Sequence, residues 1–201
     1  MKILLFSIVV ASTFLGVVCA QQLSRNDPDL SKAAHLLGEL CGYSLDNSIL
    51  EKVKSSSVSF ENNVFRAEFL LELKPVDRYL KASLYFGCFL PGKDSMGSKI
   101  GVPLTARGEI ANEDSGGRYA RNVVWERKYT GLNWIGTMAY VDSIFGDGSS
   151  RKIPAYFMTC PKVADLPCFS LEFERNDLVG REVDRIQDLI HGIYIVDHSK
   201  K

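Results

Sequence analysis

The sequence predicts an α+β domain: a mostly antiparallel sheet of six to eight strands, with an N-terminal and a C-terminal helix packed on one face. Two observations support this prediction. Apolar residues recur at helical spacing near both ends of the chain, after Asp27-Pro28-Asp29 and again after Asp177. From Val58 to Glu174 they instead alternate with polar residues or form short runs between turns, as strands do.

The first 20 residues have the pattern of a secretory signal. Lys2 precedes an apolar run from Ile3 to Val18, and the small residues Val18 and Ala20 precede the expected cut. This run is shorter than the roughly 20 residues that a spanning helix needs. A lipoprotein signal is disfavoured because Val18, rather than a very small residue, precedes Cys19. We therefore predict a cleaved signal peptide over 1–20, a single domain over 21–201, and a periplasmic or secreted location.

The charge balance excludes some classes of partner. Residues 1–20 contain one lysine and no acidic residue, so the mature chain has 23 basic and 24 acidic residues. A nucleic-acid binder needs a concentrated basic face, and the charges here are scattered. No run of like charge suits an anionic membrane surface. The sequence therefore predicts no nucleic-acid partner and no membrane association after signal cleavage.

Four cysteines remain in the mature chain: Cys41, Cys88, Cys160 and Cys168. An even number in an exported chain indicates disulfides, and four cysteines allow three pairings. The short loop between Cys160 and Cys168 favours a bond between those two, which leaves Cys41 with Cys88 to join the first helix to the sheet. Four free thiols are the alternative. No metal site is expected, because the chain has no C-x-x-C pair.

The helices are expected at both ends of the sheet region. The first begins at Pro28, and Gly42 ends it. A shorter helix follows over Asn47–Lys54, with Asp46 as its N-cap. The C-terminal helix, which ends near Gly192, has an apolar stripe formed by Val183, Ile186, Ile190 and Ile193.

The strands follow from period-two alternation, which is clearest in V-F-R-A-E-F-L-L-E-L over Val64–Leu73. Asn112–Arg118 is predicted to be a polar loop, and Gly146-Asp147-Gly148 a hairpin turn. The other expected strands are Ala82–Leu90, Lys99–Leu104, the hairpin of Arg121–Tyr129 with Asn133–Phe145, then Arg151–Cys160, Cys168–Glu174 as the strand that closes the sheet, and a last short strand at Ile193–Val196.

Two fragments resemble the motifs of chymotrypsin-like serine proteases. Ala33-Ala34-His35 resembles the segment around the catalytic histidine, and Asp114-Ser115-Gly116-Gly117 the segment around the serine. His35 lies within a predicted helix, and Glu113 replaces the glycine that the protease motif requires. The pairs Glu68 with Glu72 and Glu172 with Glu174 fit a solvated sheet face. The sequence thus predicts no catalytic residue and no cofactor.

Candidate partner-binding residues lie in two polar loops and on the aromatic hairpin. The loops over Pro91–Gly101 and Asn112–Arg118 are polar enough to contact a partner. Trp125, Trp134, Tyr129 and Tyr140 form either an aromatic binding surface or core beneath the sheet. The sequence does not decide between these two for every ring. The candidates are Lys93, Asp94, Asp114, Arg118 and Trp134.

The C-terminal part, N-W-I-G-T…G-D-G…R-K-I-P-A-Y-F-M-T-C…C-F-S-L-E-F-E followed by G-I-Y-I-V, resembles in layout the periplasmic immunity proteins that neutralise effectors of bacterial type VI secretion. This resemblance covers roughly 80 residues. It implies a non-catalytic protein that caps the active site of a partner protein. We therefore expect an exported binding protein, such as an immunity or inhibitor protein. The alternatives are a small secreted hydrolase and a carrier of a small apolar ligand.

Overall fold

The computed structural model describes residues 28–90, 104–114, 117–175 and 178–196. The predicted signal peptide over residues 1–20 lies outside these ranges. So do the candidate residues Lys93 and Asp94, and residues 99–103 of a predicted strand.

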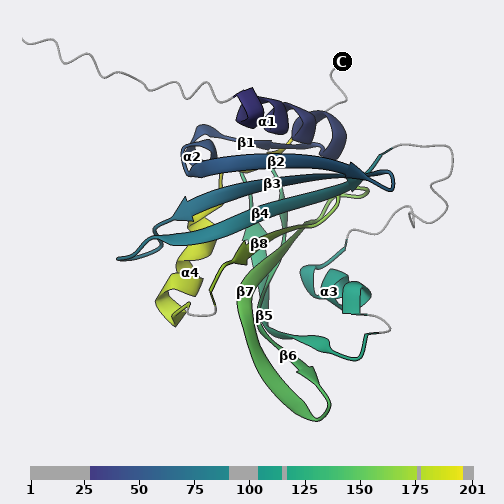
Figure 1. The fold of residues 1–201 in the computed structure, drawn as a ribbon, viewed down its shortest axis with the longest axis vertical. Helices are drawn as coiled ribbons and strands as arrows, with labels where there is room; N and C mark the ends of the chain where they lie inside the picture. The colour runs from purple at the N-terminus through teal and green to yellow at the C-terminus, as the bar shows by residue number, and fades with distance from the viewer. Residues whose placement is uncertain (1–27, 91–103, 115–116, 176–177, 197–201) are drawn as a thin grey trace, which may run out of the picture.

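Four helices and nine strands make up the described part of the chain (Figure 1). The helices are α1 (Pro28–Cys41), α2 (Asn47–Leu50), α3 (Ala106–Asp114) and α4 (Gly180–Leu189). The strands are β1 (Tyr43–Leu45), β2 (Val53–Glu61), β3 (Val64–Leu73), β4 (Leu80–Phe89), β5 (Ala120–Thr130), β6 (Ile135–Gly146), β7 (Ser149–Pro161), β8 (Phe169–Phe173) and β9 (Ile193–Ile195).

The main sheet has seven strands in the order β2-β3-β4-β8-β7-β6-β5, and every neighbouring pair is antiparallel. This confirms the α+β class. The prediction that Cys168–Glu174 closes the sheet is wrong, because β8 lies at its centre. Leu171 is opposite Leu84 of β4 on one side and Phe157 of β7 on the other. A five-residue strand therefore joins two halves of the sheet that are far apart in sequence.

The last short strand is confirmed, but its partner lies outside the main sheet. β9 pairs with β1, with Tyr43 opposite Ile195 and Leu45 opposite Ile193. The sequence pattern did not show β1, which has three residues. Gly42 precedes it with φ +71°, the left-handed conformation that commonly ends a helix. α1 therefore ends at the predicted residue, and the chain turns directly into β1.

Side chains on the two faces of the sheet form two separate apolar clusters. In β6, Met138 and Tyr140 belong to the larger cluster, whereas Ala139 and Val141 belong to the smaller one. This follows from the alternation of side chains along a strand. Both α1 and α4 contribute to the larger cluster through Leu37, Ile186 and other residues. That the two helices pack on one face stays a prediction.

The smaller cluster is covered by α3, which the sequence did not predict. Asn112 and Asp114, placed in a polar loop, are helical, so that prediction is wrong at its start. The helix is weakly amphipathic, and only Ala106 and Ile110 are buried. Polar contacts position it instead. The predicted helix Asn47–Lys54 is also shorter than expected, because β2 begins at Val53.

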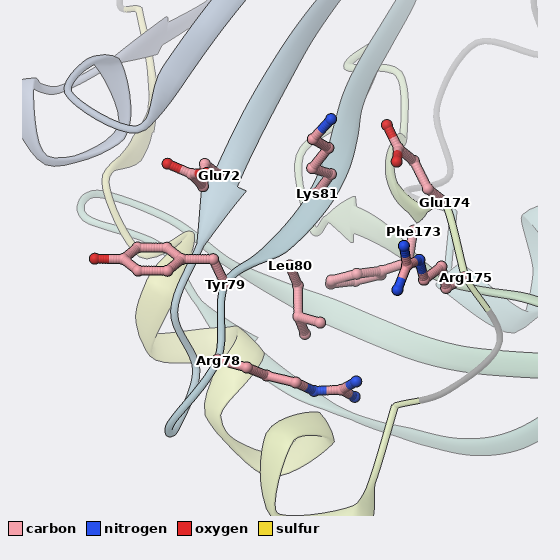
Figure 2. Close-up of a pocket in the computed structure, with 8 residues that line it drawn as sticks. All are labelled: Glu72, Arg78, Tyr79, Leu80, Lys81, Phe173, Glu174 and Arg175. Atoms are coloured by element: carbon pink, nitrogen blue, oxygen red, sulfur yellow. The ribbon is translucent and has the colours of Figure 1, made fainter.

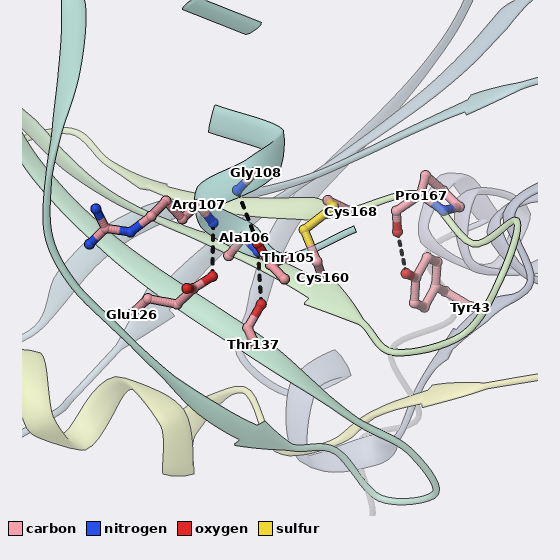
Figure 3. Close-up of a disulfide and its surroundings, with 10 residues drawn as sticks. All are labelled: Tyr43, Thr105, Ala106, Arg107, Gly108, Glu126, Thr137, Cys160, Pro167 and Cys168. Atoms are coloured by element: carbon pink, nitrogen blue, oxygen red, sulfur yellow. Dashed lines mark hydrogen bonds between the residues drawn. A yellow bond between two sulfur atoms is a disulfide. The ribbon is translucent and has the colours of Figure 1, made fainter. Parts of the chain in front are cut away.

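The predicted disulfides are both present. Cys41–Cys88 joins α1 to β4, with 5.5 Å between the Cα atoms. Cys160–Cys168 closes the loop between β7 and β8, with 4.3 Å between the Cα atoms. The Tyr43 hydroxyl donates a hydrogen bond to the carbonyl oxygen of Pro167 in that loop (Figure 3). The two disulfides therefore lie near the same end of the sheet, because Cys88 of β4 and Cys160 of β7 both follow the residues that pair with Phe169 of β8.

Candidate protein-binding site

The turn between β6 and β7 is a tight two-residue connection. Asp147 has φ 52° and Gly148 has φ 75°, so both central residues are left-handed, as a type I′ turn requires. Aspartate and glycine are among the residues that adopt this conformation most readily. This confirms the hairpin turn predicted at Gly146-Asp147-Gly148. The hairpin of β6 and β7 extends away from the rest of the molecule (Figure 1).

The carboxylate of Asp147 organises the end of this hairpin. One oxygen accepts a hydrogen bond from Arg118 Nε at 2.8 Å, and the other accepts one from the Tyr119 hydroxyl at 2.7 Å. The Tyr119 ring lies on Gly146, where an added Cβ would come within 2.0 Å of the ring. Only glycine leaves room for this contact. The segment before β5 is therefore fastened to the β6–β7 turn.

This end of the hairpin exposes two aromatic rings and an arginine. Arg118 is 75% exposed in its side chain, Tyr119 47% and Phe145 54%. Tyr119 covers the face to which a Gly146 side chain would point, so Phe145, one residue earlier in β6, points to the opposite face. Tyrosine and arginine are enriched among residues that dominate binding energy at protein interfaces. We call Arg118, Tyr119, Phe145 and Asp147 the hairpin tip.

Asp114 lies near the tip but serves the fold. Its carboxylate accepts a hydrogen bond from the backbone N–H of Arg121 at 2.6 Å and lies 3.2 Å from the Arg121 guanidinium. The side chain of Asp114 is only 15% exposed. Glu113 also binds this guanidinium at 2.5 Å, and burial raises the pKa of its carboxyl. Asp114 therefore fastens the end of α3 to β5 and offers little surface to a partner.

The start of α3 is fastened in the same way, by polar groups of β5 and β6 (Figure 3). The N–H of Ala106 donates to Thr137 Oγ1 at 2.8 Å, and the N–H of Arg107 donates to Glu126 Oε1 at 2.9 Å. Thr105 Oγ1 accepts from the N–H of Gly108 at 3.1 Å. These acceptors satisfy N–H groups that have no partner within a helix. These hydrogen bonds therefore hold α3 against β5 and β6, although the helix buries little apolar surface.

Trp134 lies in the core, at the far end of β5 and β6 from the hairpin tip. It is 6% exposed, and its Nε1 donates to the carbonyl oxygen of Ile193 at 3.0 Å. Its ring centroid lies 5.1 Å from that of Tyr129. The structure therefore places Trp134 between the two sheets, where no partner reaches it. Of the predicted candidates in the described ranges, only Arg118 belongs to the hairpin tip.

Sequence reasoning missed Tyr119, Phe145 and Asp147 as site residues. The Gly-Asp-Gly turn was recognised, but nothing in the sequence shows that residues 118 and 119 reach it. The contact joins positions 28 and 29 residues apart. The sequence does contain one signal. Tyr119 precedes the predicted strand Arg121–Tyr129, and Phe145 ends the next predicted strand, directly before the Gly-Asp-Gly turn.

A depression of about 250 Å³ lies beside the turn between β3 and β4 (Figure 2). Arg78 and Arg175 flank Phe173 there, while Tyr79 points away from them. The guanidinium of Arg78 is already bound to the buried carboxylate of Glu182. The depression is lined by Glu72, Arg78, Tyr79, Leu80, Lys81, Phe173, Glu174 and Arg175, so charged groups of both signs surround it.

The described ranges contain no group of three or more His, Cys, Asp or Glu residues placed to bind a metal. His35 lies within α1, as expected, with its Nδ1 3.5 Å from Glu39. Ser115 of the protease-like fragment lies outside the described residues. In those same ranges, none of the helices has the length and apolar character needed to cross a membrane.

Comparisons of the chain with protein-family models, with curated proteins and with solved structures give no match.

Proposed function

We propose that this chain is a non-catalytic binding protein that works outside the reducing cytosol and inhibits a partner protein through its hairpin tip. The observation that supports this most is the tip itself. Two exposed aromatic rings and an exposed arginine stand at the end of an extended hairpin, and Asp147 fixes two of these side chains in place. Such groups are the usual anchors of protein interfaces.

The fixed geometry of the tip suits binding in a cleft. Arg118 and Tyr119 are both hydrogen-bonded to Asp147 in the free protein. They therefore lose little side-chain freedom when a partner binds, which reduces the entropic cost of association. Arg118 and Asp147 neutralise each other, so the affinity of the tip would come from its two aromatic rings and from hydrogen bonds donated by the exposed Arg118 guanidinium. A narrow tip of this kind can enter and cover the active site of an enzyme.

Two further points favour an exported inhibitor. The two disulfides fit an oxidising compartment. The resemblance of the C-terminal part to immunity proteins of type VI secretion effectors suggests that the partner is a toxic enzyme. The depression of Figure 2 is open and lined by charged groups, which suits a small apolar ligand poorly. We therefore prefer an inhibitor to a carrier.

The test compares two variants of the oxidised protein in capturing a partner from periplasmic or secreted extract. Tyr119→Ala with Phe145→Ala removes both rings of the tip. Phe89→Ala is the control, because Phe89 is 81% exposed at a distant strand end. We expect one stoichiometric partner to bind the wild type and the control, with a loss of roughly tenfold or more in affinity for the tip variant.

The captured partner is then assayed with each protein added. Inhibition by the wild type and by Phe89→Ala, but not by the tip variant, supports the proposal. Equal inhibition by all three proteins contradicts the role of the tip. The absence of a partner in the native compartment contradicts the proposed function as a whole.

A further inference from the structure

The two edges of the main sheet differ in how they are protected against pairing with another strand. β5 carries Arg121, Glu126, Arg127 and Lys128, and its pairing is irregular between Asn122 and Trp125. Charges and bulges of this kind prevent an edge from pairing with a further strand. β2, at the other edge, has neither charge nor proline from Ser55 to Phe60. Its one irregularity lies before this stretch, between Val53 and Ser55.

Although α1 packs against the core face of β2, the stretch from Ser55 to Phe60 is accessible. Ser55, Ser57 and Ser59 are exposed on the face that carries Leu70, Glu68 and Arg66 of β3. On the core face Val58 is half-buried and Phe60 is 56% exposed. Among the described residues only β3 pairs with β2, so one row of its backbone hydrogen-bonding groups has no strand partner. An exposed edge of this kind is a template for another strand.

We propose that two copies of this protein pair antiparallel through β2, about a two-fold axis at Val58, to form one continuous sheet. A two-fold axis perpendicular to the sheet keeps each face on its own side, so opposite residues must come from the same face. Centred on Val58, the register sets Ser57 opposite the second copy's Ser59. It also sets Ser56 opposite the second copy's Phe60.

This register is favoured over the neighbouring one. Pairing centred on Ser57 would set Phe60 opposite Lys54 and Val53 opposite Glu61, which places charged groups against apolar ones. Pairing centred on Val58 brings the two Val58 side chains together, with a Phe60 ring on each side. Each Phe60 ring already lies 5.2 Å from the buried Phe65 ring, so the dimer would extend the apolar core across the junction.

The proposed contact is independent of the proposed function. The hairpin tip is formed by the β6–β7 turn and the segment before β5, whereas the contact uses the β2 edge on the other side of the sheet. Both tips of the dimer therefore remain available to partners. Because dimerisation is measured on the pure protein, its failure and the failure of partner capture are separate results.

A pair of charge variants on the exposed face tests the register. Ser57→Lys with Ser59→Lys sets lysine opposite lysine twice across the axis. Ser57→Lys with Ser59→Glu sets lysine opposite glutamate twice, and within each copy it places Lys beside Glu68 and Glu beside Arg66. The mass of each oxidised protein is measured by light scattering after size-exclusion chromatography, and folding is checked by circular dichroism.

We expect dimers for the wild type and for the Lys/Glu variant, and a monomer for the Lys/Lys variant. A monomeric wild type overturns the proposal. A dimeric Lys/Lys variant, or a monomeric Lys/Glu variant, overturns the β2 register. Should the Lys/Lys variant not fold, Val58→Cys gives the answer, since opposite residues of an antiparallel pair lie within disulfide range. A covalent dimer is expected for Val58→Cys but not for Phe60→Cys, and the reverse overturns the register.

Discussion

The guanidinium of Arg78 donates two hydrogen bonds to the carboxylate of Glu182, 104 positions later in the chain. Nε lies 2.7 Å from Oε1 and Nη2 lies 2.8 Å from Oε2. The Glu182 side chain is 4% exposed, and Oε2 also accepts from the N–H of Val179 at 3.0 Å. A single buried carboxylate thus caps α4 and joins it to the turn between β3 and β4. Figure 2 shows the position of Arg78 in this turn.

Replacing Arg78 by methionine should destabilise the protein, because the buried carboxylate of Glu182 loses its charged partner. Arg78 is 42% exposed, so solvent screens the pair, and we expect about 1–2 kcal/mol rather than the larger loss of a fully buried pair. Urea unfolding gives the difference. Arg185→Met is the control, since its partner Asp188 is 3.9 Å away and 73% exposed, and a change within about 0.5 kcal/mol is expected. Equal losses for both variants would contradict the assignment.

The stability of the protein should depend on pH through Glu182. Hydrogen bonds from Arg78 are the largest cause that lowers the pKa of this carboxyl. In the unfolded chain the pKa of this carboxyl is about 4.3. The folded state therefore binds fewer protons than the unfolded state at pH values near this pKa. The stabilisation is complete above that value and is lost as pH falls through the folded pKa. We expect the wild type to lose its advantage over Glu182→Gln below about pH 4. An advantage that stays constant down to pH 3 in urea unfolding experiments would contradict this.

The two disulfides should contribute unequally to stability. Cys41–Cys88 spans 47 positions and Cys160–Cys168 spans 8. In the chain-entropy description, removal costs about 4 kcal/mol for the longer loop and about 2.5 kcal/mol for the shorter. Denaturant unfolding of the two double-serine variants measures this order. A larger loss for Cys160→Ser with Cys168→Ser would show that native contacts of the short loop, rather than unfolded-chain entropy, dominate.

Trp134 should behave as a core residue. Trp134→Ala removes a buried ring and the hydrogen bond to Ile193, so we expect a loss of about 3–5 kcal/mol. Trp125 is half-buried, with the Arg127 guanidinium 4.4 Å from its ring centroid, and Trp125→Ala should cost less. Each variant keeps one tryptophan, so acrylamide quenching of its fluorescence measures how exposed that remaining ring is. Stronger quenching of Trp134 than of Trp125 would show that Trp134 is exposed to solvent and would contradict its place in the core.

The residues that alternate strictly were the most informative in sequence. Phe65, Ala67, Phe69 and Leu71 all lie in the core, as their period-two pattern predicts. The disulfide pairing also followed from loop length alone. These signals are local, because a strand face and a short loop are determined by neighbours in the chain. The structure contains both the alternating strand and the predicted disulfides.

The elements that the sequence did not show depend on distant contacts. β1 has three residues and exists because β9 pairs with it. α3 has little apolar periodicity, and Glu126 and Thr137 of the sheet satisfy its first N–H groups. The same holds for the candidate site, since Arg118 and Tyr119 become part of it only through Asp147. No pattern within a short window records such contacts.

The central place of β8 has a consequence for how the chain folds. Until residue 173 has been synthesised, β4 and β7 are both unpaired edges, one in each half of the sheet. The two halves can each form from local hairpins, but their union waits for a five-residue segment that must fit between them. Such late, non-local pairing slows folding, and until it occurs the unpaired strand edges are prone to aggregation. Protection of the nascent chain by a chaperone would matter most in this interval.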